Sequence, residues 1–237
     1  MKKKIFLSLA AVLVVLIAVF IAFKERIVLK VARLNIKKTL PISKVEIEKA
    51  EFHPFSSLQL KGINIKSPLQ KYSIYIKNVR VEYSLISLLK AVIDKVDVSG
   101  IDVSISKNIK VKPAKPLFKI KELKAGGTIK FQEFKIQGLG IKLRLLAKDR
   151  YAGNLNAEGV TLGKLKISNL NADIEYSNTG LSVPDFRFSA FAGEIKGGIS
   201  AVLTGPQVDF TLEAEGKNVD LAKLDEDFNL KEKFEVT

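Results

Sequence analysis

From Pro41 onward, apolar and polar residues alternate along most of the chain. The alternation is clearest at Val79 to Tyr83, Ile199 to Leu203 and Val208 to Ala214. A period of two residues is that of a half-buried β-strand, whose successive side chains point to opposite faces of a sheet. The sequence therefore predicts a mostly β fold.

The alternation changes parity at intervals, always at a Gly or an Asn. Apolar residues lie four and two positions before this residue, and one and three positions after it. Six residues follow the pattern: Gly62, Asn78, Gly100, Gly138, Gly159 and Asn169. A β-bulge would keep both apolar sets on one face, and Gly and Asn tolerate the left-handed backbone that bulges often need. A tight turn between two short strands would give the same spacing. In either case, the pattern predicts an elongated, strongly twisted antiparallel sheet.

Few helices are available to cover such a sheet. Helical spacing occurs at Leu85 to Ile93 and, more weakly, at Leu221 to Phe228. The apolar face must therefore close on itself, pack on a second sheet, or stay open to an apolar ligand as a groove. The residues expected to line this face are Leu58, Leu60, Ile63, Ile65, Val79, Val81, Ile101 and Val103.

Composition divides the β region into two segments. Residues 107–117 contain Pro113 and Pro116 and interrupt the alternation, which predicts a connector between β segments 41–112 and 113–237. Residues 107–148 hold twelve Lys or Arg against two Glu, whereas residues 149–237 hold nine against fifteen acidic residues. The basic residues there form either a solvated outer face or a surface for lipid headgroups or an acidic partner.

A long apolar run precedes the β region. Lys2, Lys3 and Lys4 are followed by nineteen residues, Ile5 to Phe23, of which Ser8 is the only polar one. As a helix this run is about 28 Å long, which matches a bilayer core. It lacks the short apolar region of a cleaved signal peptide, so it is predicted to be a transmembrane signal anchor over residues 1–23. Its representative lipid-facing residues are Ile5, Leu7, Val12, Leu16, Phe20 and Phe23.

The anchor is predicted to continue as a basic amphipathic helix over residues 24–40. Ile27, Val31 and Leu34 keep helical spacing, with Val28 and Ala32 beside them, while Lys30, Arg33 and Lys37 take other positions. Pro41 would end the helix. Such a stalk is either a solvated juxtamembrane helix or one that contacts anionic headgroups. Because basic residues flank the anchor on both sides, charge alone does not set its orientation.

Residues with catalytic or metal-binding chemistry are scarce. The chain has no Cys and one His, His53, which stands before Pro54 in an apolar context. Neither a Ser/His/Asp arrangement nor a zinc ligand set is present in the sequence. The chain also lacks Trp and any recognisable nucleic-acid-binding module. We expect no catalytic residue, no metal, no cofactor and no nucleic acid partner.

Two stretches resemble the AsmA family of bacterial envelope proteins, which is related to TamB and to the lipid-transfer proteins built from repeated β-groove units. The first is Leu58 to Ser106, in which strands beginning Gly-Ile and Asn-Val are followed by "SLISLLK" and a closing strand. The second lies in the C-terminal half and includes "FAGEIKGGISA" and "NVDLAKL". The chain is short for this family.

The resemblance implies a single-pass inner-membrane protein with a cytoplasmic N-terminus and a periplasmic β-groove. It further implies that the groove accommodates phospholipid acyl chains, and that the protein takes part in phospholipid transport between membranes and in outer-membrane maintenance. The alternative is a membrane-anchored scaffold for envelope proteins, with a closed β core and no lipid cargo. A binder of acidic cell-wall polymer, acting through residues 107–148, is a third hypothesis.

Overall fold

The computed structural model describes residues 25–37, 40, 43–67, 71–106, 118–147, 150–177, 179–202, 209–220 and 222–223. Three quarters of these residues lie in β-strands. The predicted anchor, Ile5 to Phe23, lies outside the described residues. So do the proline-containing connector at residues 107–117 and most of the helix expected at Leu221 to Phe228. Within the described ranges, no helix combines the length and the apolar character needed to cross a bilayer.

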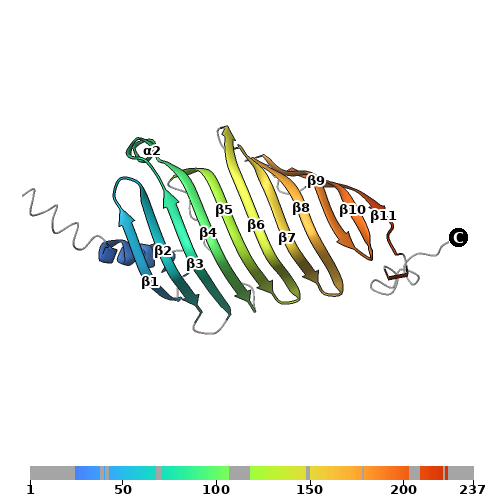
Figure 1. Cartoon of the computed structure of the whole chain (residues 1–237), viewed down its shortest axis with the longest axis horizontal. Coiled ribbons are helices and arrows are strands. Elements are labelled where there is room, and N and C mark those ends of the chain that lie inside the picture. Colours follow the sequence, from blue (N-terminus) through green and yellow to red (C-terminus); the bar gives the residue numbers. More distant parts are fainter. Residues whose placement is uncertain are drawn as a thin grey trace, which may run out of the picture.

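Eleven described strands form one open, twisted sheet in which the strands follow chain order from β1 to β11 (Figure 1). The strands are β1 (Lys44–His53), β2 (Ser57–Lys66), β3 (Tyr72–Glu82), β4 (Val92–Ile105), β5 (Lys119–Phe131), β6 (Phe134–Ala147), β7 (Arg150–Leu162), β8 (Leu165–Ser177), β9 (Gly180–Ala190), β10 (Gly193–Val202) and β11 (Asp209–Lys217). The prediction of a mostly β fold is confirmed.

The prediction of a purely antiparallel sheet is wrong at one pair. Strands β4 and β5 pair in parallel, with Val92 beside Lys119 and Ile105 beside Phe131, while all other pairs are antiparallel. Thirteen residues separate the end of β4 from the start of β5. A parallel pair needs a connection of about a dozen residues or more to return the chain to the starting end of the strand, whereas a hairpin needs only a few.

Two helices accompany the sheet in the described ranges. The helix at residues 25–37 lies at the β1 end of the sheet (Figure 1). The helix α2 (Leu85–Leu89) joins β3 to β4 and is capped by Ser84, whose side chain accepts a hydrogen bond from the Ser87 backbone N–H. This helix is shorter than the expected Leu85 to Ile93, because residues 92 and 93 already belong to β4.

The main core lies between the helix at residues 25–37 and strands β1 to β3. Val28, Leu29, Ala32 and Ile36 of the helix pack on a cluster of buried side chains from these strands. The cluster consists of Val45, Ile47, Ala50, Leu60, Ile63, Ile65 and Tyr72. Arg33 adds a hydrogen bond from its guanidinium to the Ile47 carbonyl oxygen, at 3.3 Å. The helix therefore covers one end of the sheet.

The apolar residues of this helix form two stripes rather than one. The stripe on the sheet contains Val28 and Ala32, as noted above. The other contains Ile27, Val31 and Leu34, which are each about half exposed. Helical spacing alone predicted that Ile27, Val31 and Leu34 share a face, but it did not indicate which face would dock on the sheet.

Candidate functional site

All six residues at which the sequence pattern changes parity lie inside strands rather than in turns. Gly62, Gly100, Gly138 and Asn169 lie in β2, β4, β6 and β8, and each has a positive φ of 53° to 65°. Asn78 and Gly159 lie in β3 and β7. A left-handed residue inside a strand is typical of a bulge, which lets the strand continue beyond the change of parity.

The changes of parity lie opposite one another on neighbouring strands. Between β2 and β3, Ile63 pairs with Ile76 and Lys61 pairs with Asn78, and Gly62 between them is not paired. Between β3 and β4, Ile76 pairs with Ile101 and Asn78 pairs with Ser99, and Gly100 between Ile101 and Ser99 is not paired. Because neighbouring strands shift together, their apolar side chains stay on one face along the full length of each strand.

The eight residues predicted to line the apolar face are brought together by this register. Leu58 lies opposite Val81, and Leu60 lies opposite Val79. Ile63 and Ile101 both lie opposite Ile76, while Ile65 and Val103 both lie opposite Ile74. All eight therefore lie on the same face of β2, β3 and β4.

One apolar row on this face is unbroken through all eleven strands. Its members are directly paired residues of successive strands: Ala50, Leu60, Val79, Val98, Ala125, Ile141, Leu155, Ala172, Phe186, Gly197 and Ala214. At about 4.8 Å per strand, ten steps give a row roughly 48 Å long. A second row continues from Ile65 to β8 through Ile74, Val103, Ile129, Ile136, Val160 and Ile167. We call this surface the apolar face.

The apolar face is covered at one end by the helix at residues 25–37, and along the rest of the described sheet its side chains are mostly half-buried or buried, with Leu139, Ala157 and Phe186 at 4–8% exposure. Leu60, Ile63 and Ile65 are buried in the core beneath the helix at residues 25–37. Val81 and Ile101, by contrast, are only half-buried. Within the described ranges each strand contacts its neighbours in the sheet, and α2 contacts β4, so no second layer of strands packs on this face. Not one described side chain on the sheet is below 2% exposure.

Several residues that line the apolar face further along were not singled out from the sequence. They come from β5 to β10 and include Leu123, Ile129, Leu139, Ile141, Leu155, Val160, Phe186 and Ile195. Phe186 and Phe188 stack with ring centroids 5.7 Å apart. The parity pattern around Gly138 and Gly159 already placed several of them on one face, so the same rule that chose the eight residues of β2 to β4 could have found them.

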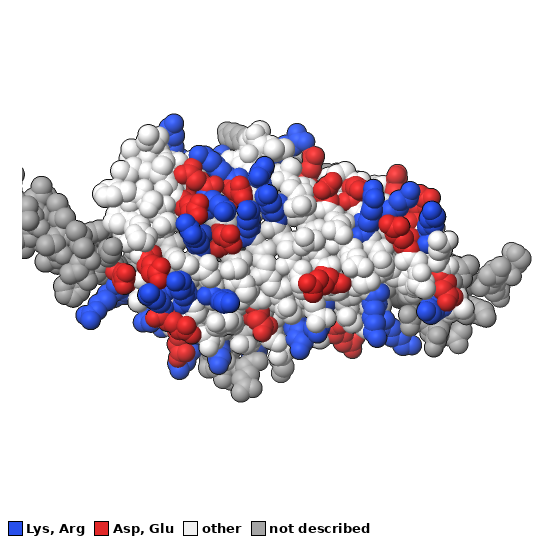
Figure 2. Space-filling view, in the orientation of Figure 1, with Lys and Arg blue, Asp and Glu red and all other residues white. Residues whose placement is uncertain are grey.

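Charged side chains mostly lie away from the apolar face, although the ion pair between Asp94 and Lys121 lies on the same face as Val96 and Leu123, near the strand ends. In the view of Figure 2 they gather mainly towards the two ends of the strands, with a largely uncharged band between them. Lys49 and Lys61 both contact the Glu51 carboxylate at 2.9 Å, and their hydrogen bonds lower its pKa to about 2. Such exposed ion pairs contribute little to stability.

A small polar cluster joins α2 to the sheet. Asp94 accepts a hydrogen bond from Lys121 Nζ at 2.5 Å, from the Ser87 hydroxyl at 2.8 Å and from the Ser84 backbone N–H at 2.9 Å. These bonds, first that of Lys121 and then that of Ser87, lower the pKa of the Asp94 carboxyl. Because every member has a partner that explains its position, the cluster serves to hold α2 on β4.

Residues suited to catalysis do not converge in the described part of the chain. His53 lies at the end of β1, where its backbone carbonyl accepts a hydrogen bond from the Tyr83 hydroxyl at 3.0 Å. Among the described residues there is no group of three or more His, Asp or Glu side chains that could hold a metal ion. The arrangement with the clearest chemical character is therefore the apolar face.

Comparison of the chain with protein-family models, with curated proteins and with solved structures finds no match.

Proposed function

We propose that this protein is a membrane-anchored lipid-handling protein of the AsmA type, whose apolar face takes up phospholipid acyl chains. Its β domain would lie in the periplasm of a bacterial envelope and its anchor in the inner membrane. There it would take part in phospholipid transport between the two membranes and in outer-membrane maintenance.

The observation that supports the proposal most strongly is the unbroken apolar row from Ala50 to Ala214. Apolar surface left in water is unfavourable by about 25 cal/mol per Å², so a face of this extent favours an apolar occupant. Each methylene of an acyl chain that leaves water for such a surface gains about 0.8 kcal/mol. An acyl chain laid across the strands would bury its methylenes against Val79, Val98 and Ile141, while the headgroup stayed in solvent.

The chemistry of the row indicates binding without specific recognition. All of its members are aliphatic or aromatic side chains or glycine, and none offers a hydrogen bond to a headgroup. Affinity would therefore depend on acyl chain length rather than on headgroup type. Beyond β3 no described strand packs on this face, which supports an open face rather than the closed core expected of a scaffold.

Variants on the two faces of one strand test the proposal. Ile141 in β6 belongs to the apolar row, whereas the adjacent Lys142 points to the opposite face, where it pairs with Lys124 and Asn154. The full chain in detergent is loaded with phospholipid, and the bound lipid is measured by mass spectrometry. We expect Ile141→Asn to lower the bound lipid severalfold and Lys142→Asn to leave it unchanged. Equal binding by both variants, or no lipid on the unmodified chain, would contradict the proposal.

A further inference from the structure

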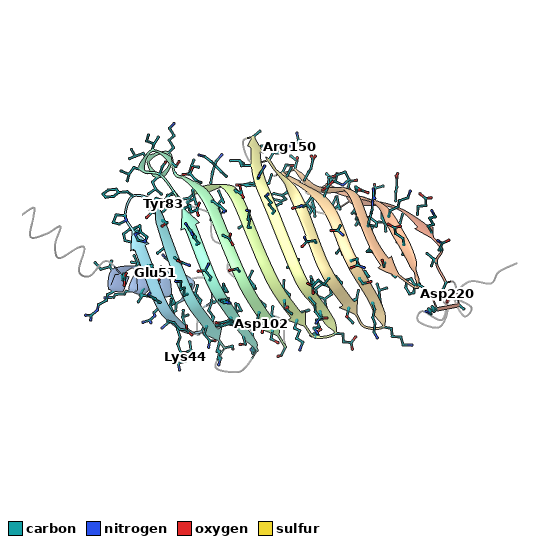
Figure 3. All side chains as sticks on the ribbon, in the orientation of Figure 1. Lys44, Glu51, Tyr83, Asp102, Arg150 and Asp220 are labelled. Atoms are coloured by element: carbon teal, nitrogen blue, oxygen red, sulfur yellow. The ribbon has the colours of Figure 1, made fainter. Side chains whose placement is uncertain are left out.

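A row of lysines and hydroxyl side chains crosses eight strands on the face opposite the apolar face. Its members are paired residues of successive strands: Lys44, Lys66, Ser73, Ser104, Lys130, Lys135, Thr161 and Lys166. We call it the lysine row. It contains no carboxylate, and seven steps of about 4.8 Å make it roughly 34 Å long. Lys44, labelled in Figure 3, marks its first member at one end of the strands.

Two pairs in the lysine row place like charges directly opposite each other. Lys44 lies opposite Lys66, and Lys130 lies opposite Lys135. Like charges in this position destabilise a sheet. Lys44 is balanced by an ion pair with Glu46 at 2.7 Å. Lys66, Lys130, Lys135 and Lys166 form no ion pair with any described residue.

At the opposite end of the strands, residues of opposite charge lie next to one another. There Glu82 lies opposite Lys95, Lys95 lies beside Glu122, and Glu122 lies opposite Arg144. Charges alternate in sign along that row, and Glu122 forms ion pairs with Lys124 at 3.3 Å and with Arg144 at 3.7 Å. These strands pair their charges at one end, whereas Lys66, Lys130, Lys135 and Lys166 at the other end form no ion pair with a described residue. The lysines at that end therefore indicate a different role.

Two hollows in the surface lie along the lysine row. One, of about 370 Å³, is lined by Lys66, Ser67, Tyr72, Ser73, Ser104 and Ser106. Its lining combines one ammonium group with several hydroxyls, which are hydrogen-bond donors that suit the oxygens of a phosphate group. The other, of about 550 Å³, is bordered by Lys77, Lys130 and Lys135 together with Thr128 and Gln137. Asp102 is the acidic residue in its lining, so three lysines face one carboxylate.

We propose that the lysine row is a contact surface for the phosphate groups of an anionic lipid bilayer. Lysine suits this role because its ammonium is a compact charge on a flexible stem that can reach scattered headgroups. The row also begins at Lys44, shortly after the helix at residues 25–37, which exposes Lys30 and Lys37 beside half-exposed Ile27, Val31 and Leu34.

The predicted membrane anchor at residues 1–23 favours a bilayer over a soluble polyanion, because it would hold the lysine row near a membrane surface. The lysine row would then lay one long edge of the sheet along that surface. Because the row lies on the face opposite the acyl-binding surface, the inference does not depend on the proposed lipid cargo.

The test uses the full chain in nanodiscs of neutral phosphatidylcholine, and measures its association with vesicles. The vesicles contain either phosphatidylcholine alone or phosphatidylcholine with about one-third phosphatidylglycerol. We expect association with the anionic vesicles only, and a decrease as the salt concentration rises. The double variant Lys130→Gln/Lys135→Gln should bind these vesicles about 10-fold more weakly or worse.

The matched control is Lys90→Gln/Lys95→Gln, which removes the same charge at the other end of the strands and should bind as the unmodified chain does. Removal of the opposed lysines should also leave the melting temperature unchanged or raise it, so that weaker binding is not a consequence of unfolding. Equal weakening in both double variants, or unchanged binding by Lys130→Gln/Lys135→Gln, overturns the proposal. Binding to soluble polyphosphate in preference to the vesicles overturns it as well. Loss of acyl-chain binding in the Ile141→Asn variant, with vesicle association retained, separates the two proposals.

Discussion

The side chain of Glu48 on β1 lies across Gly62 on β2, at the point where both strands shift their apolar parity. Gly62 has a φ of +61°, and a Cβ built there would collide with the Glu48 carboxyl group. The same relationship recurs along the sheet, where Lys77 lies across Gly100 and Glu158 lies across Gly138. At Gly62, Gly100 and Gly138, the parity changes therefore depend on glycine for both its backbone conformation and its missing side chain.

The first prediction concerns these glycines. Gly62→Ala should lower the free energy of unfolding by about 1–3 kcal/mol, because alanine is strained in the left-handed region and Glu48 must move. Gly159→Ala is the matched control. It lies at the parity change of β7 without a positive φ, and its added Cβ would come no closer than 3.8 Å to the atoms around it. Chemical denaturation in a fixed detergent measures the difference, and equal destabilisation by the two substitutions would contradict it.

A second prediction separates the covered part of the apolar face from the open part. Ile63 is 3% exposed beneath the helix at residues 25–37, whereas Val81 is only half-buried. Ile63→Ala should therefore cost about 2–4 kcal/mol, since it leaves a cavity in packed surroundings. Val81→Ala should cost about 1 kcal/mol or less, because solvent already reaches the site. Both values come from denaturation curves measured without added lipid, and a larger cost for Val81→Ala would show that this side chain is also packed beneath a cover.

The third prediction is a pH dependence centred on Asp94. Its pKa in the folded protein lies below the ordinary value of 3.8, because Lys121 and Ser87 donate to the carboxylate. The folded state thus binds this proton more weakly than the unfolded chain. The resulting stabilisation is present above about pH 4 and is lost as the pH falls through the lowered pKa.

Removal of the Asp94 carboxylate should abolish that dependence. Asp94→Asn is expected to lower the melting temperature at pH 7 by a few degrees, in line with about 1 kcal/mol for an exposed pair in a chain of this size. The two melting curves should converge at strongly acidic pH. Asp97→Asn on the same strand serves as the control, and a melting temperature difference that stays constant with pH would contradict the assigned cause.

The sequence predicted the strands because alternation follows from local chemistry. Alternation sets which side chains share a face. The eight residues expected on the apolar face lie there for the same reason.

Two features depended on tertiary placement, which alternation does not encode. Periodicity within β4 and β5 is the same whether the pair is parallel or antiparallel, so the parallel pairing of Val92 with Lys119 could not be predicted from it. Similarly, Leu60 and Val79 are equivalent in the pattern and lie opposite each other, but only Leu60 belongs to the buried cluster beneath the helix at residues 25–37.

The lysine row was also hidden from the sequence. Lys66, Ser104 and Lys130 are far apart along the chain, and they become neighbours only through the register of β2 to β5. The excess of basic residues at 107–148 indicated a charged surface, but gave no sign that opposed lysines would collect at one end of the strands and balanced charges at the other.

The most direct test of the central claim is photo-crosslinking to lipid from matched positions on the two faces of the sheet. A photoreactive amino acid replaces Val81 or Ile101 on the apolar face, and Arg80 or Asp97 on the opposite face and away from the lysine row, in the full chain within its native membrane. We predict phospholipid adducts from Val81 and Ile101, detected by mass spectrometry, and no more than background from Arg80 and Asp97. Crosslinks from Val81 and Ile101 to protein alone, or equal lipid yields from both faces, would contradict the account.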